Sequence, residues 1–295
     1  LPPQSNLRLR INVTTRQLEQ ENNADGWQVI RPVQISDIDI NTLGIKPYMP
    51  DFFYLPNNII RFAIQGTGMV FDFDQQVATL KRVDRTEHSG YNFSATRFYR
   101  NKVLYSVGGE GFWNYNKHIT YFDDKSSKEW ELFRPKNKGP EHIADGFQGY
   151  SSKLDVFYSG GSNNKNFLED ETIEFTKEFQ KFNFKSKSWE VLGKISNKIP
   201  LADHRSIYWN GQHFVQLAKD RLYIIDPEKN EIYLYKDNGT YFESSGTHYV
   251  SHDTIKYYHF AERGPISNIP VTALLKKSTY LGPFYEQDYT SYYLA

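Results

Sequence analysis

Cysteine is absent from this 295-residue chain, and neither sign of charge is in excess, since 35 Lys and Arg residues balance 35 Asp and Glu residues. Without thiols the chain can form no disulfide, no zinc–thiolate site and no thiol nucleophile. Proteins that bind the phosphate backbone usually carry a basic excess, so nucleic acid is not an expected partner. No apolar run reaches the length of about 18 residues that a transmembrane helix needs, so we expect no membrane span within the chain.

Linear catalytic signatures are missing as well. The chain has no His-Glu-x-x-His string, no glycine-rich phosphate loop, no Gly-x-Ser-x-Gly string and no EF-hand pattern. We therefore predict no catalytic residue, no metal site and no cofactor. An enzyme that acts on polysaccharides through carboxylates scattered over several loops would leave no linear motif, so this alternative stays open.

What the chain has in quantity is aromatic residues, which make up 16% of it. Tyr, Phe and Trp fit half-buried pleated surfaces, so this share favours strands over helices. One pattern recurs along the chain: strand, tight polar turn, strand, loop, strand, short turn, strand. Its clearest copies lie at residues 97–133 and 154–192. A repeat of about 50 residues with four strand signals is typical of a β-propeller blade.

Two hairpin turns mark each unit of the repeat, because turn-forming residues stand between alternating apolar positions. The first turn of each unit is predicted at residues 56–58, 100–101, 152–153, 210–211 and 251–253. The second is predicted at residues 71–76, 123–124, 185–186 and 225–230, with a weaker copy at 274–277.

These turns predict an all-β protein with negligible helix, a β-propeller of four-stranded blades in which residues 1–295 form a single domain. Six blades fit the repeat, with five as the alternative. Residues 7–13 and 27–30 look like the outer half of one more unit. In a closed ring the other terminus usually completes such a unit, and residues 284–293 could supply the strand.

The glycine pairs carry a resemblance to a known family. Gly108-Gly109 is followed by Trp130, and Gly160-Gly161 by Trp189. A strand that ends in Gly-Gly, followed by a tryptophan on a later strand, resembles the kelch repeat, and the resemblance extends over residues 53–285. Gly66-Thr67-Gly68 matches only in part, and two later units lack the glycines. The resemblance implies a kelch-like propeller. Copper oxidases of this class use a cysteine crosslinked to tyrosine, which this chain cannot form.

Three loops between units carry an acidic residue followed by histidine: Glu87-His88, Glu141-His142 and Asp203-His204. In a propeller such loops gather on one face around the central channel. They could surround a polar ligand, or they could be repeat residues that hydrogen-bond neighbouring blades, and both interpretations stay open. The loop after Gly109 adds Trp113, which could stack on a sugar or peptide or could cap the space between blades.

The ligand is therefore expected on this face, because loops on a rigid scaffold are where propellers present variable residues. The predicted ligand-binding residues are Arg85, Glu87, His88, Glu110, Trp113, Tyr115, Glu141, His142, Asp145, Asp203, His204, Arg205 and Arg221. Their mixed charges suit a neutral or zwitterionic ligand better than a polyanion.

For function, the sequence indicates a non-catalytic binding module that recognises a glycan, a peptide or a protein. The chain starts at Leu1 without Met and ends in a half-apolar stretch at Ala295. We expect it to be a fragment of a longer protein, the extracytoplasmic (periplasmic or cell-surface) sensor or binding domain of a membrane-anchored bacterial protein. The alternatives are the polysaccharide-acting enzyme and an intracellular kelch adaptor that docks a protein partner.

Overall fold

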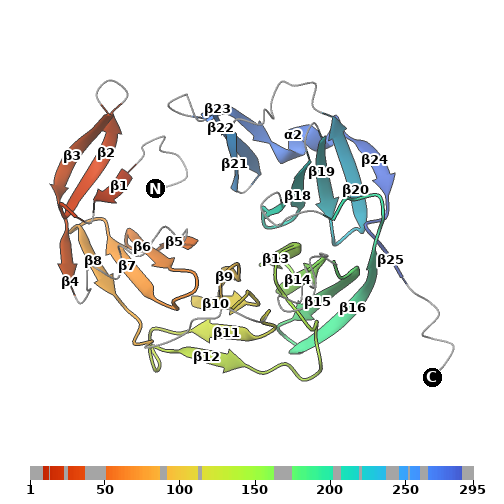
Figure 1. Ribbon diagram of the computed structural model, residues 1–295, viewed down its shortest axis with the longest axis horizontal. Helices are drawn as coiled ribbons and strands as arrows, with labels where there is room; N and C mark the ends of the chain where they lie inside the picture. Colours follow the sequence, from red (N-terminus) through yellow and green to blue (C-terminus); the bar gives the residue numbers. More distant parts are fainter. Residues whose placement is uncertain are drawn as a thin grey trace. The chain divides into compact units, whose positions relative to one another are not determined.

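The structure is a computed structural model. It describes residues 9–12, 14–22, 26–36, 51–86, 92–111, 115–162, 175–201, 207–218, 221–236, 246–251, 253–259 and 265–287. Over these residues the chain is nearly all β, with many antiparallel strands and one short helix, which confirms the predicted all-β class (Figure 1). The chain divides into two compact units. The first consists of Leu1–Phe112 and His118–Phe133, and the second of Trp113–Lys117 and Arg134–Ala295.

The first unit contains three sheets. One has the order β1 (Leu9–Asn12), β2 (Gln17–Asn22), β3 (Gly26–Pro32). The second has the order β4 (Gln34–Ser36), β8 (Thr79–Arg82), β7 (Val70–Asp74), β6 (Ile59–Ala63), β5 (Asp51–Leu55), and β4 runs parallel to β8. The third has the order β12 (Trp130–Phe133), β11 (Ile119–Phe122), β10 (Val103–Val107), β9 (Thr96–Arg100).

The second unit also contains three sheets. One has the order β13 (Phe147–Ser151), β14 (Val156–Gly160), β15 (Glu178–Asn183), β16 (Ser188–Ile195), β25 (Tyr285–Glu286). The next has the order β17 (Ile207–Trp209), β18 (Phe214–Ala218), β19 (Arg221–Asp226), β20 (Glu231–Lys236), β24 (Thr279–Gly282). The last has the order β21 (Gly246–Ser251), β22 (Thr254–His259), β23 (Pro265–Pro270), and the helix α2 (Val271–Leu275) follows it.

The predicted hairpins are confirmed in four successive sheets. The turns at 56–58, 100–101, 152–153 and 210–211 each join two antiparallel strands. So do the second turns, which connect β7 to β8, β11 to β12, β15 to β16 and β19 to β20. The first turn of the fifth unit, predicted at residues 251–253, joins β21 to β22, although its His252 lies outside the described residues.

Two expectations for the C-terminal part are wrong. Residues 274–277 are not a hairpin turn of a further unit; they include the end of α2, and β24 then pairs with β20 of the preceding sheet. Residues 285–286 do not complete an N-terminal unit either, because they form β25 and pair with β16. The rest of the predicted closing strand, residues 288–293, lies outside the described residues.

Phe284 explains where β25 goes. Its ring is fully buried. The ring centroid lies 4.7 Å from that of Phe179 and 5.1 Å from that of Phe147. The side chain of Asn230 accepts a hydrogen bond from the Tyr285 amide (2.8 Å) and donates one to the Tyr285 carbonyl (2.9 Å). The segment is therefore held by a buried aromatic cluster and by one amide side chain, contacts that a strand-period pattern does not reveal.

The Gly160-Gly161 pair has a steric role at the end of β14. A Cβ atom at Gly160 would lie 2.7 Å from Cδ2 of Phe179 on the neighbouring strand, which is closer than real contacts allow. Gly161 has a φ of +69°, a conformation that residues with a side chain rarely adopt. The pair therefore lets β14 end tightly against β15 and turn sharply, and this is where the candidate site lies.

Candidate functional site

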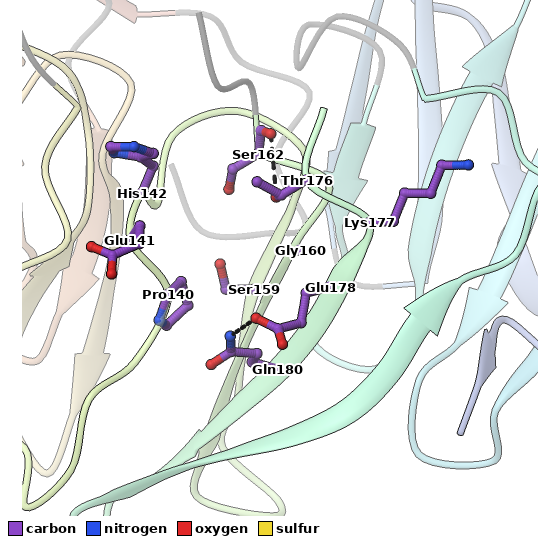
Figure 2. A pocket seen from close by; sticks show the side chains of 10 residues that line it. All are labelled: Pro140, Glu141, His142, Ser159, Gly160, Ser162, Thr176, Lys177, Glu178 and Gln180. Atoms are coloured by element: carbon purple, nitrogen blue, oxygen red, sulfur yellow. Dashed lines mark hydrogen bonds between the residues drawn. The ribbon is translucent and has the colours of Figure 1, made fainter. Parts of the chain in front are cut away.

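A pocket of about 180 Å³ lies in the second unit, at the end of β14 and the start of β15 (Figure 2). Three segments form its walls: the loop before β13, the last residues of β14 with those that follow, and the first residues of β15 with those that precede them. We call it the β14–β15 pocket. Its lining residues are Pro140, Glu141, His142, Ser159, Gly160, Ser162, Thr176, Lys177, Glu178 and Gln180.

Strand register brings two of these walls together. β14 and β15 are antiparallel, with Ser159 opposite Gln180. Beyond the strands, the Ser162 carbonyl accepts hydrogen bonds from the amide of Thr176 (2.9 Å) and from its hydroxyl (3.3 Å). Residues 159–162 and 176–180 are therefore fixed side by side although they are distant in the chain.

The third wall is the loop that precedes β13. The amide of Ile143 donates to the carbonyl of Asn116 (3.1 Å), and Ile143 itself is fully buried, which anchors the loop. The ring of His142 meets that of Tyr115 edge to face at 5.7 Å. This contact orients the imidazole at the pocket wall.

Glu141 is held by two lysines. Lys138 and Lys117 both form ion pairs with its carboxylate, the latter at 3.0 Å. Their hydrogen bonds, with that of Lys138 the largest contribution, lower the pKa of Glu141 to about 2. The carboxylate is therefore ionised at any physiological pH and already neutralised by its neighbours.

Three polar atoms at the pocket have no hydrogen-bond partner among the described residues: Ser159 Oγ, Ser162 Oγ and His142 Nδ1. Both serines are only 1% exposed. Figure 2 shows the Ser159 hydroxyl directed into the space that the labelled side chains enclose. Buried polar atoms are nearly always paired, so three unpaired ones around one cavity are an unusual concentration.

The remaining polar side chains of the pocket are paired within the protein. Gln180 Nε2 donates to the Glu178 carboxylate, a bond drawn in Figure 2. Lys177 points away from the cavity, and its Nζ donates to Asn197 Oδ1 at 2.8 Å. The pocket therefore presents hydroxyl groups and an imidazole, with its charged side chains already engaged.

No protein-family model and no curated protein sequence matches this chain. Among solved structures, it is similar to one titled "Structure of YjhT", at 14% sequence identity and a TM-score of 0.44, over 70% of this chain and 71% of that one.

The structure brings three of the predicted ligand-binding residues together, since Glu141 and His142 line the pocket and Tyr115 contacts His142. Asp145 follows in the same loop, where its carbonyl accepts a hydrogen bond from Gln148, but it does not line the cavity. Arg221 is an exposed residue at the start of β19, away from the pocket lining.

The other predicted residues fall elsewhere. Arg85 and Glu110 belong to the first unit, where the Arg85 amide donates to the Lys128 carbonyl and the Glu110 carboxylate accepts from Ser94. Six of the predicted residues lie outside the described part of the chain: Glu87, His88, Trp113, Asp203, His204 and Arg205.

The sequence prediction missed the serines. Ser159 and Ser162 flank the Gly-Gly pair in the string Ser159-Gly160-Gly161-Ser162, and the repeat pattern around them indicates only a structural motif. The signal that could have found them is the pair of serines beside the two glycines. Residues this small can leave a cavity, and their hydroxyl groups then lie on its wall. Gln180 and Glu178 gave no such signal, because alternation in a strand does not distinguish a pocket from solvent.

Within the described residues, no group of three or more His, Asp or Glu side chains could hold a metal ion. No helix in the described ranges has the length and apolar character needed to cross a membrane.

Proposed function

We propose that this protein is a non-catalytic binding module and that a glycan or peptide ligand occupies the β14–β15 pocket. The observation that carries the proposal is a set of three buried polar atoms, on Ser159, Ser162 and His142, that have no hydrogen-bond partner in the described part of the chain. A buried polar group without a partner costs about 1–3 kcal/mol. A ligand that supplies the missing hydrogen bonds would recover this free energy on binding, so the fold has a reason to keep these groups unpaired.

The ion pairs around Glu141 favour binding over the alternative of a carboxylate-based enzyme. A general acid at neutral pH needs a raised pKa, whereas Lys138 and Lys117 lower that of Glu141 to about 2. Of the two carboxylates that line the pocket, this one therefore cannot donate a proton to a leaving group.

We propose further that the sheets are blades of one kelch-like propeller of six blades formed by residues 1–295. Four consecutive sheets support this, since each contains four antiparallel strands in chain order, and six sheets occur in the described part of the chain. Small-angle X-ray scattering of the purified chain tests it. The profile of a single compact disc is expected, and the profile of two separate bodies would contradict it.

The extracytoplasmic location, with the chain as sensor or binding domain of a membrane-anchored bacterial protein, also remains a proposal and rests on the sequence expectations. The complete reading frame tests it. A signal peptide and a membrane span on either side of the chain would support it. Their absence from the complete frame would favour the intracellular adaptor.

The binding function itself is tested with glycan and peptide arrays probed with the full chain. For any ligand found, we expect the double variant Ser159→Ala, Ser162→Ala to lose binding. Ser106→Ala is the matched control, because Ser106 is a buried serine at the corresponding place on β10 of the first unit. Ligand binding that survives in the double variant would show that the site lies elsewhere.

A further inference from the structure

We infer that the β14–β15 pocket takes one uncharged, hydroxyl-bearing sugar residue, such as the end of a neutral glycan chain. This inference rests on the proposed function, since it names the ligand class of the same pocket. Three properties of the cavity support it: its hydrogen-bonding groups, its charges and its size.

The unpaired groups match hydroxyl ligands. A serine hydroxyl donates one hydrogen bond and accepts others, and a neutral imidazole nitrogen does one or the other according to its tautomer. Ser159, Ser162 and His142 can therefore each adapt to a partner that is itself both donor and acceptor. The hydroxyl groups of a sugar have this property, whereas a carboxylate only accepts and an ammonium group only donates.

The charges of the pocket disfavour an anionic sugar. Among its described lining residues the one lysine, Lys177, is directed away and bonded to Asn197. Glu178 contributes a carboxylate whose described partner is the amide of Gln180. The two lysines beside Glu141 are already paired with that carboxylate. A buried carboxylate on the ligand would find no unpaired lysine or arginine among the described lining residues, and an unpaired buried charge is costly.

The size of the pocket limits the ligand to one residue. Its volume of about 180 Å³ is below the range of about 300–1,000 Å³ of pockets that enclose larger ligands. A longer glycan would therefore place one terminal residue in the pocket and leave the rest outside.

Isothermal titration with the full chain tests the inference. The probes are methyl glycosides of glucose, galactose, mannose and N-acetylglucosamine, the matching uronic acids, and short neutral tripeptides. We expect at least one neutral glycoside to bind, and its uronic acid counterpart to bind at least about ten-fold more weakly. Ser159→Ala and Ser162→Ala should each weaken the neutral sugar by about ten-fold, the effect of one lost hydrogen bond, and Ser106→Ala should have no effect.

The possible failures are distinguishable. Preferred binding of a uronic acid or a tripeptide, lost in Ser159→Ala, would overturn the ligand class and leave the pocket as the binding site. A ligand whose affinity is unchanged in both serine variants would overturn the proposed function as well. If none of the probes binds, the inference of a single neutral sugar residue is wrong.

Discussion

His213 is a buried histidine whose pKa the fold lowers. It is 6% exposed and directly precedes β18, and its Nε2 lies 3.7 Å from Oδ2 of the buried Asp226. Burial lowers the pKa of His213, and Lys229 lowers it further, while Asp226 and Asp253 oppose this. Burial prevails because the free-energy cost of desolvating an imidazolium exceeds the stabilisation that one carboxylate at 3.7 Å provides.

Acid should therefore destabilise the protein through His213. A histidine with a lowered folded pKa contributes stability above its unfolded pKa of about 6.5, and this is lost as the pH falls through the folded value. We expect urea unfolding of the wild type to show decreasing stability from about pH 7 to pH 5, and His213→Asn to lack that component. His118→Asn is the control, because His118 is exposed. A wild-type profile identical to that of His213→Asn would show that His213 titrates alike in both states.

At the scale of the element, one turn design recurs in four sheets. A residue at the end of the third strand, or directly after it in the case of Asp123, accepts hydrogen bonds from backbone amides two or three residues later. The acceptor is the Oδ1 of Asp74, Asp123, Asn183 or Asp226. In three of these turns the last residue has a φ near +55°, at Ala78 (53°), Lys187 (59°) and Asn230 (59°). Side-chain acceptors of this kind stabilise a turn through local hydrogen bonds to its backbone.

Asn183→Ala should cost about 1 kcal/mol of stability, because it removes the acceptor for the amides of Lys185 and Ser186 at 2.9 and 3.0 Å. Chemical unfolding measures this. Ser186→Ala is the matched control, since the exposed Ser186 contributes its backbone to the turn. An equal loss in both variants would mean that the acceptor of Asn183 is not what stabilises the turn.

These turns also show why part of the fold could be predicted. Asp226-Pro227 and Lys185-Ser186 act over a few residues, so the sequence around them contains the whole signal. The partner of β16 could not be predicted in this way, because Tyr285 and Ile195 pair across a long stretch of chain and neither residue is distinctive. The pocket could be predicted only in part. Its Glu141-His142 wall is a motif in the sequence, whereas the structure is needed to show that the hydroxyl of Ser159 has no hydrogen-bond partner among the described residues.

At the scale of the whole molecule, the segment from β24 to β25 joins two sheets of the second unit. β24 extends the sheet of β17–β20, β25 extends the sheet of β13–β16, and Phe284 between them is buried. The amide of Ser196 donates to the carbonyl of Phe284 at 2.8 Å, which fastens the segment to the end of β16.

Phe284→Ala should therefore destabilise the second unit by about 3–5 kcal/mol, since it leaves a cavity among Phe147, Phe179 and Tyr285. Thermal unfolding followed by near-ultraviolet circular dichroism measures the loss. Tyr280→Ala is the control, because Tyr280 on β24 is 55% exposed and should change stability little. Similar effects of the two substitutions would show that the segment is not held by its buried ring.

The position of this segment in the chain has a consequence for synthesis on the ribosome. The sheet of β9–β12 has all its strands once Phe133 has emerged, but the edge of β16, which ends at Ile195, waits for a strand that begins at Tyr285. At about 5–20 residues per second, those roughly 90 residues take on the order of 5–20 s. During that time an unpaired strand edge is open to other nascent chains, so the second unit is where we expect chaperones to act.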